Sequence, residues 1–325
     1  MIAKVSALNF VSSAEGLPTK ILVELERKLE SAVGDDPFIS EACTPLLKGG
    51  KRLRPILFLI SSRAGGSSSY EKLLPLAAAI ELIHTASLVH DDILDASKVR
   101  RGVSTANAKY GAQVAVLIGD YLFAKAFEFV ANGHYGDEVS AILSRLVKNL
   151  CIGEIKQDLS LFTIPTLGEY YERIALKTAI FLSSCCRLGA LTAGLERSMI
   201  EALSSYGMSL GLAFQITDDL LDFFGDEALT GKKLGGDLKS GVITLPILRA
   251  LGSEELRSIV TREGISDGEV ERAIELVRAS DALMYCRRRA EAHVEAARLV
   301  LPTMIDPTVS KVLEQAAAFI VDRSW

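Results

Sequence analysis

Proline is scarce in this sequence, with 9 of the 325 residues against a usual share of about 5%. Aromatic residues are also few, at 6%, although apolar residues of all kinds reach 49%. A disordered chain would have too little apolar surface to offset the entropy lost on folding, so disorder is excluded. The composition predicts a globular protein with a large aliphatic core, and long apolar stretches without proline favour helices.

Long runs of like charge are also missing. The 36 Lys and Arg residues and the 41 Asp and Glu residues give a net charge of −5. No basic block is long enough to suggest a nucleic-acid partner. Any phosphate chemistry must therefore depend on local basic residues or on metal ions.

Sequence signals for export and membrane insertion are missing as well. The first residues lack the basic region and apolar run of a signal peptide. The longest nearly apolar run, 74–89, contains Glu81 and His84 and is shorter than the ~20 residues that a membrane helix needs. We expect a cytoplasmic protein with at most peripheral membrane contact.

Cysteine is infrequent and shows no metal-binding or redox spacing. The five cysteines form no CxxC pair and lie in apolar or helical-looking segments: Cys43, Cys151, Cys185, Cys186 and Cys286. We interpret them as buried thiols in a reducing compartment.

Apolar residues recur at helical spacing along almost the whole chain. Leu22, Leu25 and Leu29 follow the rhythm of one helix face. The same spacing predicts helices at about 46–63, 70–97, 107–131, 137–161, 168–192, 197–224, 242–251, 254–261, 267–279, 281–299 and 308–323. With no convincing alternating strand, repeat or linker, we predict an all-α fold. It would be one domain over 1–325, with many antiparallel helices around a central bundle. The glycine-rich stretch 225–241 is predicted to be a loop that covers a ligand.

Two runs of aspartates lie inside apolar helical segments, DDILD at 91–95 and DDLLD at 218–222. In each run the first and last acids are four residues apart on one helix face, where like charges repel. Buried carboxylates persist when they are paired or hold metal, and oxygen clusters suit Mg²⁺ shared with substrate phosphates. One run alone would more simply be a solvated helix end. Two matching runs predict a metal site formed by Asp91, Asp92, Asp95, Asp218, Asp219 and Asp222.

Basic and polar residues near the two runs predict diphosphate ligands. The basic residues are Lys51, Arg52, Arg54, Arg100, Arg101, Lys177 and Lys232, and the polar ones are His84, Thr178 and Gln215. Each basic residue alone is more simply a surface charge. Together with two acid runs they indicate that metal ions bridge one diphosphate and that cations hold another.

The motifs occur in a specific order: GGKRLRP (49–55), HTASLVHDDILD (84–95), KVRRG (98–102), Lys177-Thr178, FQITDDLLD (214–222) and GDEALTGKKLGGDL (225–238). In this order they resemble the all-trans polyprenyl diphosphate synthases, a family of head-to-tail prenyltransferases. The resemblance spans at least 49–246. It implies an all-helical, usually dimeric fold around a deep apolar cavity. It also implies Mg²⁺-dependent condensation of isopentenyl diphosphate with an allylic diphosphate.

The resemblance implies roles for matching residues. Asp91 and Asp95 would bind Mg²⁺ that bridges the allylic diphosphate, and Asp218 would hold a further ion, with about three ions per active site. The allylic diphosphate would contact Arg100, Lys177, Thr178, Gln215 and Lys232. Isopentenyl diphosphate would contact Lys51, Arg54, His84 and Arg101. The catalytic set would be Asp91, Asp95, Asp218 and Lys177.

One departure from the family pattern concerns a cation. The family usually has a lysine in a Gly-Lys-x-Thr-Leu-Pro segment, whereas this sequence has Val242 at that position. The resemblance therefore leaves two expectations open, weaker binding of the allylic diphosphate or substitution by Lys239.

The length of the product is expected to depend on residues before the first acid run. Ala86 lies about 7–8 Å before Asp91 along a helix, where the short-chain branch usually has a bulky aromatic floor. With Ala86 and Ser87 the tunnel would stay open, and Ile83, Ile80 and a facing Phe123 or Phe127 would set its limit. We expect long-chain products of about C30–C50, the quinone side-chain class, as the resemblance implies. The simpler alternative is that Ala86 only packs against another helix.

Other functions remain open at this point. The chain could be a short-chain farnesyl or geranylgeranyl diphosphate synthase, or the catalytic subunit of a heteromeric long-chain synthase with a small partner. A terpene cyclase or head-to-head synthase would need no isopentenyl site, which GGKRLRP and Arg101 argue against. Complete acid runs argue against a non-catalytic scaffold subunit. A di-iron bundle would need Glu-x-x-His pairs beside the acids, and the sequence has none there.

Overall fold

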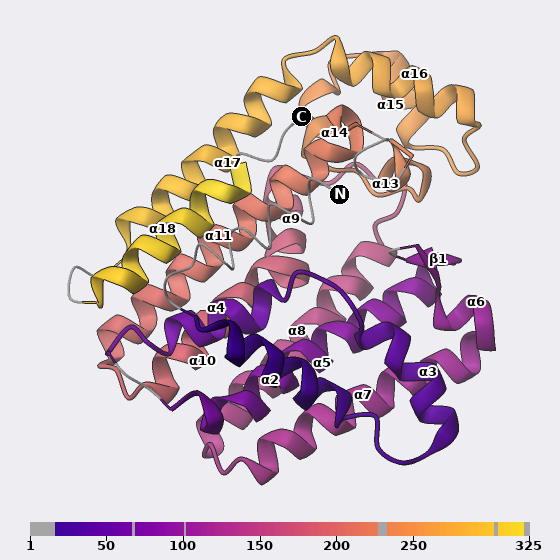
Figure 1. Cartoon of the computed structure of the whole chain (residues 1–325). Coiled ribbons are helices and arrows are strands. Elements are labelled where there is room, and N and C mark those ends of the chain that lie inside the picture. Colours follow the sequence, from indigo (N-terminus) through magenta and orange to yellow (C-terminus); the bar gives the residue numbers. More distant parts are fainter. Residues whose placement is uncertain (1–16, 67–68, 101, 227–232, 302–304, 322–325) are drawn as a thin grey trace.

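The computed structural model describes residues 17–66, 69–100, 102–226, 233–301 and 305–321, and almost all regular structure in them is helical (Figure 1). The helices of the first half are α2 (Thr19–Glu30), α3 (Pro37–Leu47), α4 (Leu53–Ser61), α5 (Tyr70–Leu94), α6 (Ala106–Tyr110), α7 (Ala112–Asn132) and α8 (Asp137–Asp158). The remaining ones are α9 (Leu167–Ile174), the π-helical turn η1 (Ala175–Ala179), α10 (Ile180–Thr192), α11 (Arg197–Phe224), α13 (Gly236–Lys239), α14 (Leu245–Ala250), α15 (Glu254–Val260), α16 (Asp267–Arg278), α17 (Ala282–Leu299) and α18 (Pro307–Val321). The all-α prediction is confirmed, whereas a single domain over 1–325 stays a prediction.

One small departure from the helical prediction follows α5. Strands β1 (Val99–Arg100) and β2 (Val103–Ser104) pair antiparallel, with Val99 opposite Ser104. Gly102 has a φ of +81°, a conformation that glycine adopts at little cost and that lets the chain reverse. Strands of two residues are too short for an alternating pattern to be visible in the sequence.

Local chemistry sets several helix ends. Thr166 and Glu169 form a capping box at the start of α9, and Ser266 and Glu269 form another at the start of α16. The helix expected at 107–131 is divided into α6 and α7 at Gly111, which has a φ of +81°. The helix expected at 168–192 is also divided, because η1 interrupts it.

The long helices build one large core. α5 packs along α7, α10 packs along α4 and α11, and α17 packs along α11 and α18. In Figure 1, α11, α17 and α18 run side by side, while α14, α15 and α16 lie together near the end of α11. A separate apolar cluster joins these C-terminal helices to Phe223, near the end of α11. The two aspartate runs therefore lie at the ends of helices whose other residues are fixed by the core.

Two helical stretches, Tyr70–Leu94 and Leu167–Thr192, are long and apolar enough to cross a membrane by length and composition. The apolar run 74–89 in the sequence is shorter than a membrane helix needs, whereas the helix that contains it, Tyr70–Leu94, is long enough. In each stretch 67% of the apolar window is buried inside the protein. Both therefore have the burial expected of core helices.

The cysteine prediction is confirmed at four positions and wrong at one. Cys43, Cys185, Cys186 and Cys286 are buried free thiols. Cys151 is exposed on α8 instead, because it lies on the face of this helix that turns away from the core.

Candidate active site

The first aspartate run closes α5. Asp91 and Asp92 lie in its last turn, and Asp95 is the C-cap residue. Acids at this end are unfavourable because the helix C-terminus carries partial negative charge. Asp92 is 3% exposed, and its Oδ1 accepts a hydrogen bond of 2.6 Å from Nε of Arg100 on β1. Burial raises the pKa of Asp92, and Arg100 opposes this rise. The hairpin thus brings Arg100 to the first run.

Asp91 lies among charges of both signs. Burial raises the pKa of Asp91 to about 7, Glu154 and Asp95 add to this rise, and Lys177 and Arg100 oppose it. Nζ of Lys177 forms an ion pair of 2.9 Å with Oε2 of Glu154 on α8. Burial alone would lower the pKa of Lys177, but Glu154 and Asp91 raise it above its ordinary value. Lys177 is therefore a cation held between α8 and the first aspartate run.

Lys177 and Thr178 both lie in the π-helical turn η1. Single π-helical turns of this kind occur frequently at functional sites. Neighbouring helices approach η1 closely at two glycines. A Cβ on Gly153 of α8 would lie 3.2 Å from the backbone nitrogen of Lys177, and one on Gly211 of α11 would lie 2.4 Å from Cα of Ala179. The approach of α11 at Gly211 leaves no room for a side chain there, and the approach of α8 at Gly153 leaves little.

The second aspartate run is linked to η1 by hydrogen bonds. Tyr170 donates to Oδ2 of Asp219 at 2.7 Å, and Nε2 of Gln215 donates to Oδ1 of the same carboxylate at 2.9 Å. Oε1 of Gln215 accepts from the hydroxyl of Thr178 at 2.6 Å. Burial raises the pKa of Asp219 to about 7, and Asp237 adds to this, while the bonds from Gln215 and Tyr170 oppose it. Both oxygens of Asp219 are used within the protein.

The other two acids of the second run have different surroundings. Asp218 is exposed. The carboxylate of Asp222 accepts hydrogen bonds from the backbone amides of Gly236 at 3.0 Å and Asp237 at 3.1 Å. Asp222 therefore anchors the segment that follows the second run. Lys232 lies outside the described residues.

Lys239, the candidate substitute for the cation that is missing at Val242, is paired with another residue in this structure. Its exposed ammonium forms an ion pair with Asp267 at the start of α16. This contact lowers the pKa of Asp267. Val242 is half-buried, so the position keeps an apolar side chain where the family pattern has a charge.

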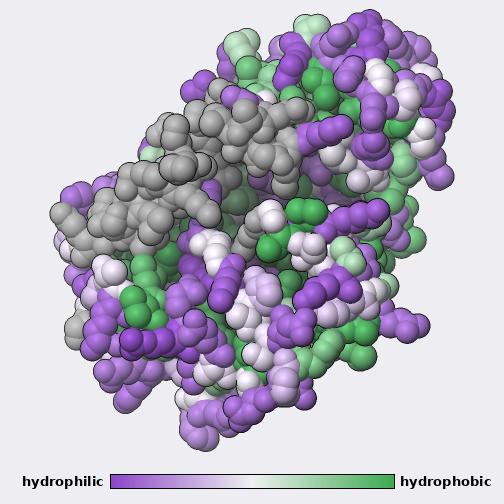
Figure 2. All heavy atoms as spheres, turned by 45° about the vertical axis from the view of Figure 1, so that its right-hand side comes forward, coloured by the Kyte–Doolittle hydropathy of each residue, from purple (hydrophilic) through white to green (hydrophobic). Residues whose placement is uncertain are grey.

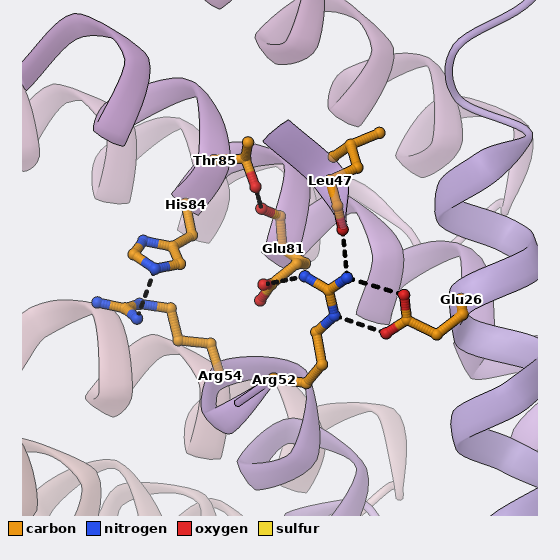
Figure 3. Close-up of polar contacts among 7 residues, drawn as sticks. All are labelled: Glu26, Leu47, Arg52, Arg54, Glu81, His84 and Thr85. Atoms are coloured by element: carbon orange, nitrogen blue, oxygen red, sulfur yellow. Dashed lines mark hydrogen bonds and ion pairs between the residues drawn. The ribbon is translucent and has the colours of Figure 1, made fainter. Parts of the chain in front are cut away.

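The structure brings together two of the residues predicted to hold isopentenyl diphosphate. Nη1 of Arg54 lies 3.0 Å from Nε2 of His84 (Figure 3). Phe181 supports both side chains, with its ring centre 4.8 Å from the guanidinium carbon of Arg54 and 6.0 Å from the His84 ring centre. Lys51 is exposed on the preceding segment. Arg101 lies outside the described residues.

The oxygen donors of the aspartates suit Mg²⁺, which substrate phosphates commonly help to hold. Among the described residues, no group of three or more His, Cys, Asp and Glu side chains lies close enough together to hold a metal ion alone. Mg²⁺ commonly uses one or two carboxylates, several waters and substrate phosphates. Asp91 and Asp95 are one turn apart, and burial disfavours the charge of Asp91, which a divalent cation would stabilise. The six-aspartate assignment stays a prediction.

The residues expected to set product length lie in two environments. Ala86 and Ile83 on α5 are fully buried, with 0% exposure. Ser87 is half-buried, as are Phe123 and Phe127 on α7, which pack against the main core. Since α5 and α7 pack along each other, the expected tunnel floor would be formed between these two helices.

The molecular surface is hollowed below the C-terminal helices, and hydrophilic and hydrophobic side chains both line the hollow (Figure 2). A separate polar cavity of about 290 Å³ lies at the ends of α4 and α10, and none of the predicted site residues lines it. Its lining residues include Ser62, Lys72 and Thr192. The predicted chemistry therefore does not depend on that cavity.

Several residues at the site had no assigned role in the sequence analysis. Glu154 and Tyr170 contact the predicted site residues only after folding, because they are distant in sequence. Glu81 did give a signal, since an acid inside the apolar run 74–89 requires a partner. That partner is Arg52.

Comparison with known proteins supports the resemblance. A family model described as polyprenyl synthetase matches residues 36–277. Heptaprenyl diphosphate synthase component 2 from Geobacillus stearothermophilus is 36% identical over 93% of this chain and 94% of its own length. Solanesyl-diphosphate synthase 2 from Oryza sativa subsp. japonica is 38% identical over 90% of this chain and 74% of its own. A short chain isoprenyl diphosphate synthase from Methanocaldococcus jannaschii is 35% identical over 94% and 95%.

A solved structure gives the same result. The polyprenyl synthase from Caulobacter crescentus CB15, complexed with calcium and isoprenyl diphosphate, superposes with a TM-score of 0.90 at 33% identity. The superposition covers 98% of each chain. Since the family model covers more than half of the chain, and the relatives exceed 30% identity over most of both lengths, this chain belongs to the polyprenyl synthetase family and is an all-trans prenyltransferase.

Proposed function

We propose that this enzyme adds isopentenyl diphosphate stepwise to an allylic diphosphate and makes a long-chain all-trans polyprenyl diphosphate. The observation that carries the proposal is the pairing of each aspartate run with diphosphate-binding side chains. Arg100 and Lys177 lie beside the first run. Thr178 and Gln215 form a hydrogen-bonded chain to the second.

The metal is proposed to be Mg²⁺, with about three ions per active site. Asp91, Asp95 and Asp218 would be its direct ligands, since Asp92 and Asp219 already accept hydrogen bonds from other side chains. Bound Mg²⁺ neutralises charge on the departing diphosphate and makes it a better leaving group.

Side chains of the protein orient the two substrates and supply further positive charge to the departing diphosphate. Lys177 and Arg100 stabilise the negative charge that develops as the allylic carbon–oxygen bond breaks. Arg54 and His84 hold the second diphosphate, so that the double bond of isopentenyl diphosphate lies beside the allylic carbon, which lowers the entropic barrier. Apolar walls keep water from the allylic cation. The released diphosphate then takes the proton that is lost.

The long product is inferred from α5 and from two relatives. The heptaprenyl and solanesyl synthases are named for long products, whereas the Methanocaldococcus relative is named for a short chain. Names alone therefore do not decide the length. The small side chain of Ala86, on the helix that ends in the first aspartate run, favours a deep tunnel.

The assembly proposed is a homodimer that is active by itself in the cytoplasm. The Geobacillus relative is named as one component of a synthase, which makes a small partner subunit the alternative. A long polyprenyl product is insoluble in water, so release would involve at most peripheral contact with a membrane.

The deciding experiment supplies the purified chain with farnesyl diphosphate, labelled isopentenyl diphosphate and Mg²⁺, and the products are sized by chromatography. We expect labelled long-chain products, which disappear when EDTA removes the metal. Asp91→Asn should abolish turnover while the protein remains folded. The proposal would be contradicted if the wild-type protein incorporated no labelled isopentenyl diphosphate, either alone or with candidate small subunits. Label incorporated only after a second subunit is added would contradict the homodimer.

A further inference from the structure

Arg52 lies inside the basic segment 51–54, yet its side chain is directed into the protein (Figure 3). Only 7% of Arg52 is exposed. Its Nε and Nη2 donate to the two oxygens of Glu26 at 2.6 and 2.8 Å, and its Nη1 donates to Glu81 at 2.8 Å. Nη2 also donates to the carbonyl of Leu47. Four of the five N–H donors of this guanidinium are therefore used within the protein.

These contacts join three helices to one short segment. Glu26 belongs to α2, Leu47 is the last residue of α3, and Glu81 lies within α5. The backbone of Arg52 is left-handed, with a φ of 49° and a ψ of 28°. A non-glycine residue keeps this unfavourable conformation only when its surroundings require it. The guanidinium contacts supply that requirement.

The bond between Arg52 and Glu81 lies next to the contact between Arg54 and His84, which are predicted to hold isopentenyl diphosphate. Glu81 and His84 are three residues apart on α5 and therefore neighbours on its surface. Arg52 binds Glu81. Arg54, two residues after Arg52, contacts His84, three residues after Glu81. The segment is thus attached to α5 at two neighbouring points.

We propose that Arg52 is a positioning residue, which holds Arg54 beside His84 so that both can bind the diphosphate of isopentenyl diphosphate. Arg52 itself does not touch the substrate, because its charge is neutralised by Glu26 and Glu81. This inference rests on the proposed function of Arg54 and His84. It differs from a general stabilising role, because it predicts a defect that is specific for one of the two substrates.

The main test is Arg52→Lys, which keeps the charge but cannot reproduce the two-pronged bond to Glu26 together with the bond to Glu81. We expect the KM for isopentenyl diphosphate to rise about tenfold or more, while the KM for farnesyl diphosphate changes less than about twofold. The matched control is Arg249→Lys. Arg249 binds Asp281 through Nε and Nη2 at 2.7 and 2.6 Å, joining α14 to the start of α17. This control should leave both KM values unchanged.

A second measurement needs no turnover. Isopentenyl diphosphate is titrated calorimetrically into the metal-free protein in EDTA, and the Kd should rise for Arg52→Lys by a factor similar to that in KM. If Arg52→Lys does not fold, Glu26→Gln retains the Glu81 and Leu47 contacts and should show a smaller shift in the same direction.

The outcomes separate this inference from the proposed function. A wild type that condenses isopentenyl diphosphate, beside an Arg52→Lys variant with an unchanged KM for it, would overturn the positioning role and leave the function intact. An equal rise in both KM values would also overturn it, because that result indicates general damage. A wild type that neither binds nor condenses isopentenyl diphosphate would overturn both.

Discussion

The hydroxyl of Tyr170 lies 2.7 Å from Oδ2 of Asp219, and this bond joins α9 to the second aspartate run. Both side chains are buried, with 0% and 2% exposure. Asp219 in turn binds Gln215, which binds Thr178 in η1. The orientation of the Gln215 amide is therefore set at one end by Asp219, which Tyr170 of α9 holds in turn, and at the other end by Thr178 of η1.

Replacing Tyr170 with Phe should damage both stability and catalysis. The change leaves a buried carboxylate oxygen without its donor, and we expect a loss of about 1–3 kcal/mol in unfolding free energy. We also expect kcat to fall about tenfold, equivalent to about 1.4 kcal/mol in the barrier, since Gln215 and Thr178 lose their fixed orientation. Denaturant melts and steady-state kinetics measure the two effects.

Tyr206→Phe is the matched control for this change. Tyr206 is also fully buried, and its hydroxyl donates to the carbonyl of Leu313 at 2.7 Å, away from both aspartate runs. A similar loss of stability with an unchanged kcat is expected. Equal losses of kcat in the two variants would show that the Tyr170 bond has no specific role at the site.

The ionisation of Asp219 should make the metal-free protein less stable as the pH rises. The pKa of Asp219 is about 7 in the folded protein, against 3.8 for an ordinary aspartate. Between these values the folded state binds more protons than the unfolded state, so its stability falls with increasing pH. Below about pH 4 and above about pH 7, the contribution of Asp219 to the unfolding free energy no longer changes with pH. Between these two limits the unfolding free energy falls by at most ~4 kcal/mol through the ionisation of Asp219.

The measurement compares wild type with Asp219→Asn in EDTA, because the asparagine cannot ionise. The difference in unfolding free energy, wild type minus variant, should decline from pH 4 to pH 7 and then level off. A difference that is independent of pH would show that burial does not raise the pKa of Asp219.

The sequence predicted the helices better than it predicted their interruptions. The long apolar run gave a helix at about 70–97, and α5 spans Tyr70–Leu94. The turn η1 was not predictable, because the helical spacing of apolar residues continues through Lys177 and Thr178. Its cause lies in tertiary contacts, since Gly153 and Gly211 allow α8 and α11 to approach the turn closely. Such contacts are not visible in local periodicity.

The site was predictable as a set of residue types but not as a network. Turn spacing placed Asp91 and Asp95 on one face, and the resemblance grouped Arg54 with His84, which the structure places 3.0 Å apart. The bond between Tyr170 and Asp219 spans 49 residues, and no spacing rule connects two positions so far apart. The partners of buried charges therefore had to come from the fold.

Enlarging Ala86 should shorten the product. Ala86→Phe places a ring about one and a half turns before Asp91, where it would fill the tunnel expected between α5 and α7. We expect the product distribution to shift to shorter chains while incorporation of the first isopentenyl unit persists. Products from radiolabelled isopentenyl diphosphate are sized by reversed-phase chromatography.

A neighbouring variant separates this effect from simple overpacking. Ser87→Phe adds the same ring one residue further on, where the side chain is half-buried and points about 100° around the helix. If Ala86 lines the tunnel, the two variants should give different product lengths. An Ala86→Phe enzyme with wild-type products would show that Ala86 is only a packing residue.

Gly211→Ala tests whether close helix approach positions the π-helical turn. Its Cβ would lie 2.4 Å from Cα of Ala179, and backbone must move to relieve this contact. We expect a loss of about 1–3 kcal/mol in unfolding free energy together with a raised KM for farnesyl diphosphate, because Lys177 and Thr178 follow the displaced backbone. Gly252→Ala is the control, since a Cβ there meets nothing within 4 Å and should change stability by less than about 0.5 kcal/mol. A Gly211→Ala enzyme with the stability and KM of the control would mean that η1 keeps its place without the close approach of α11.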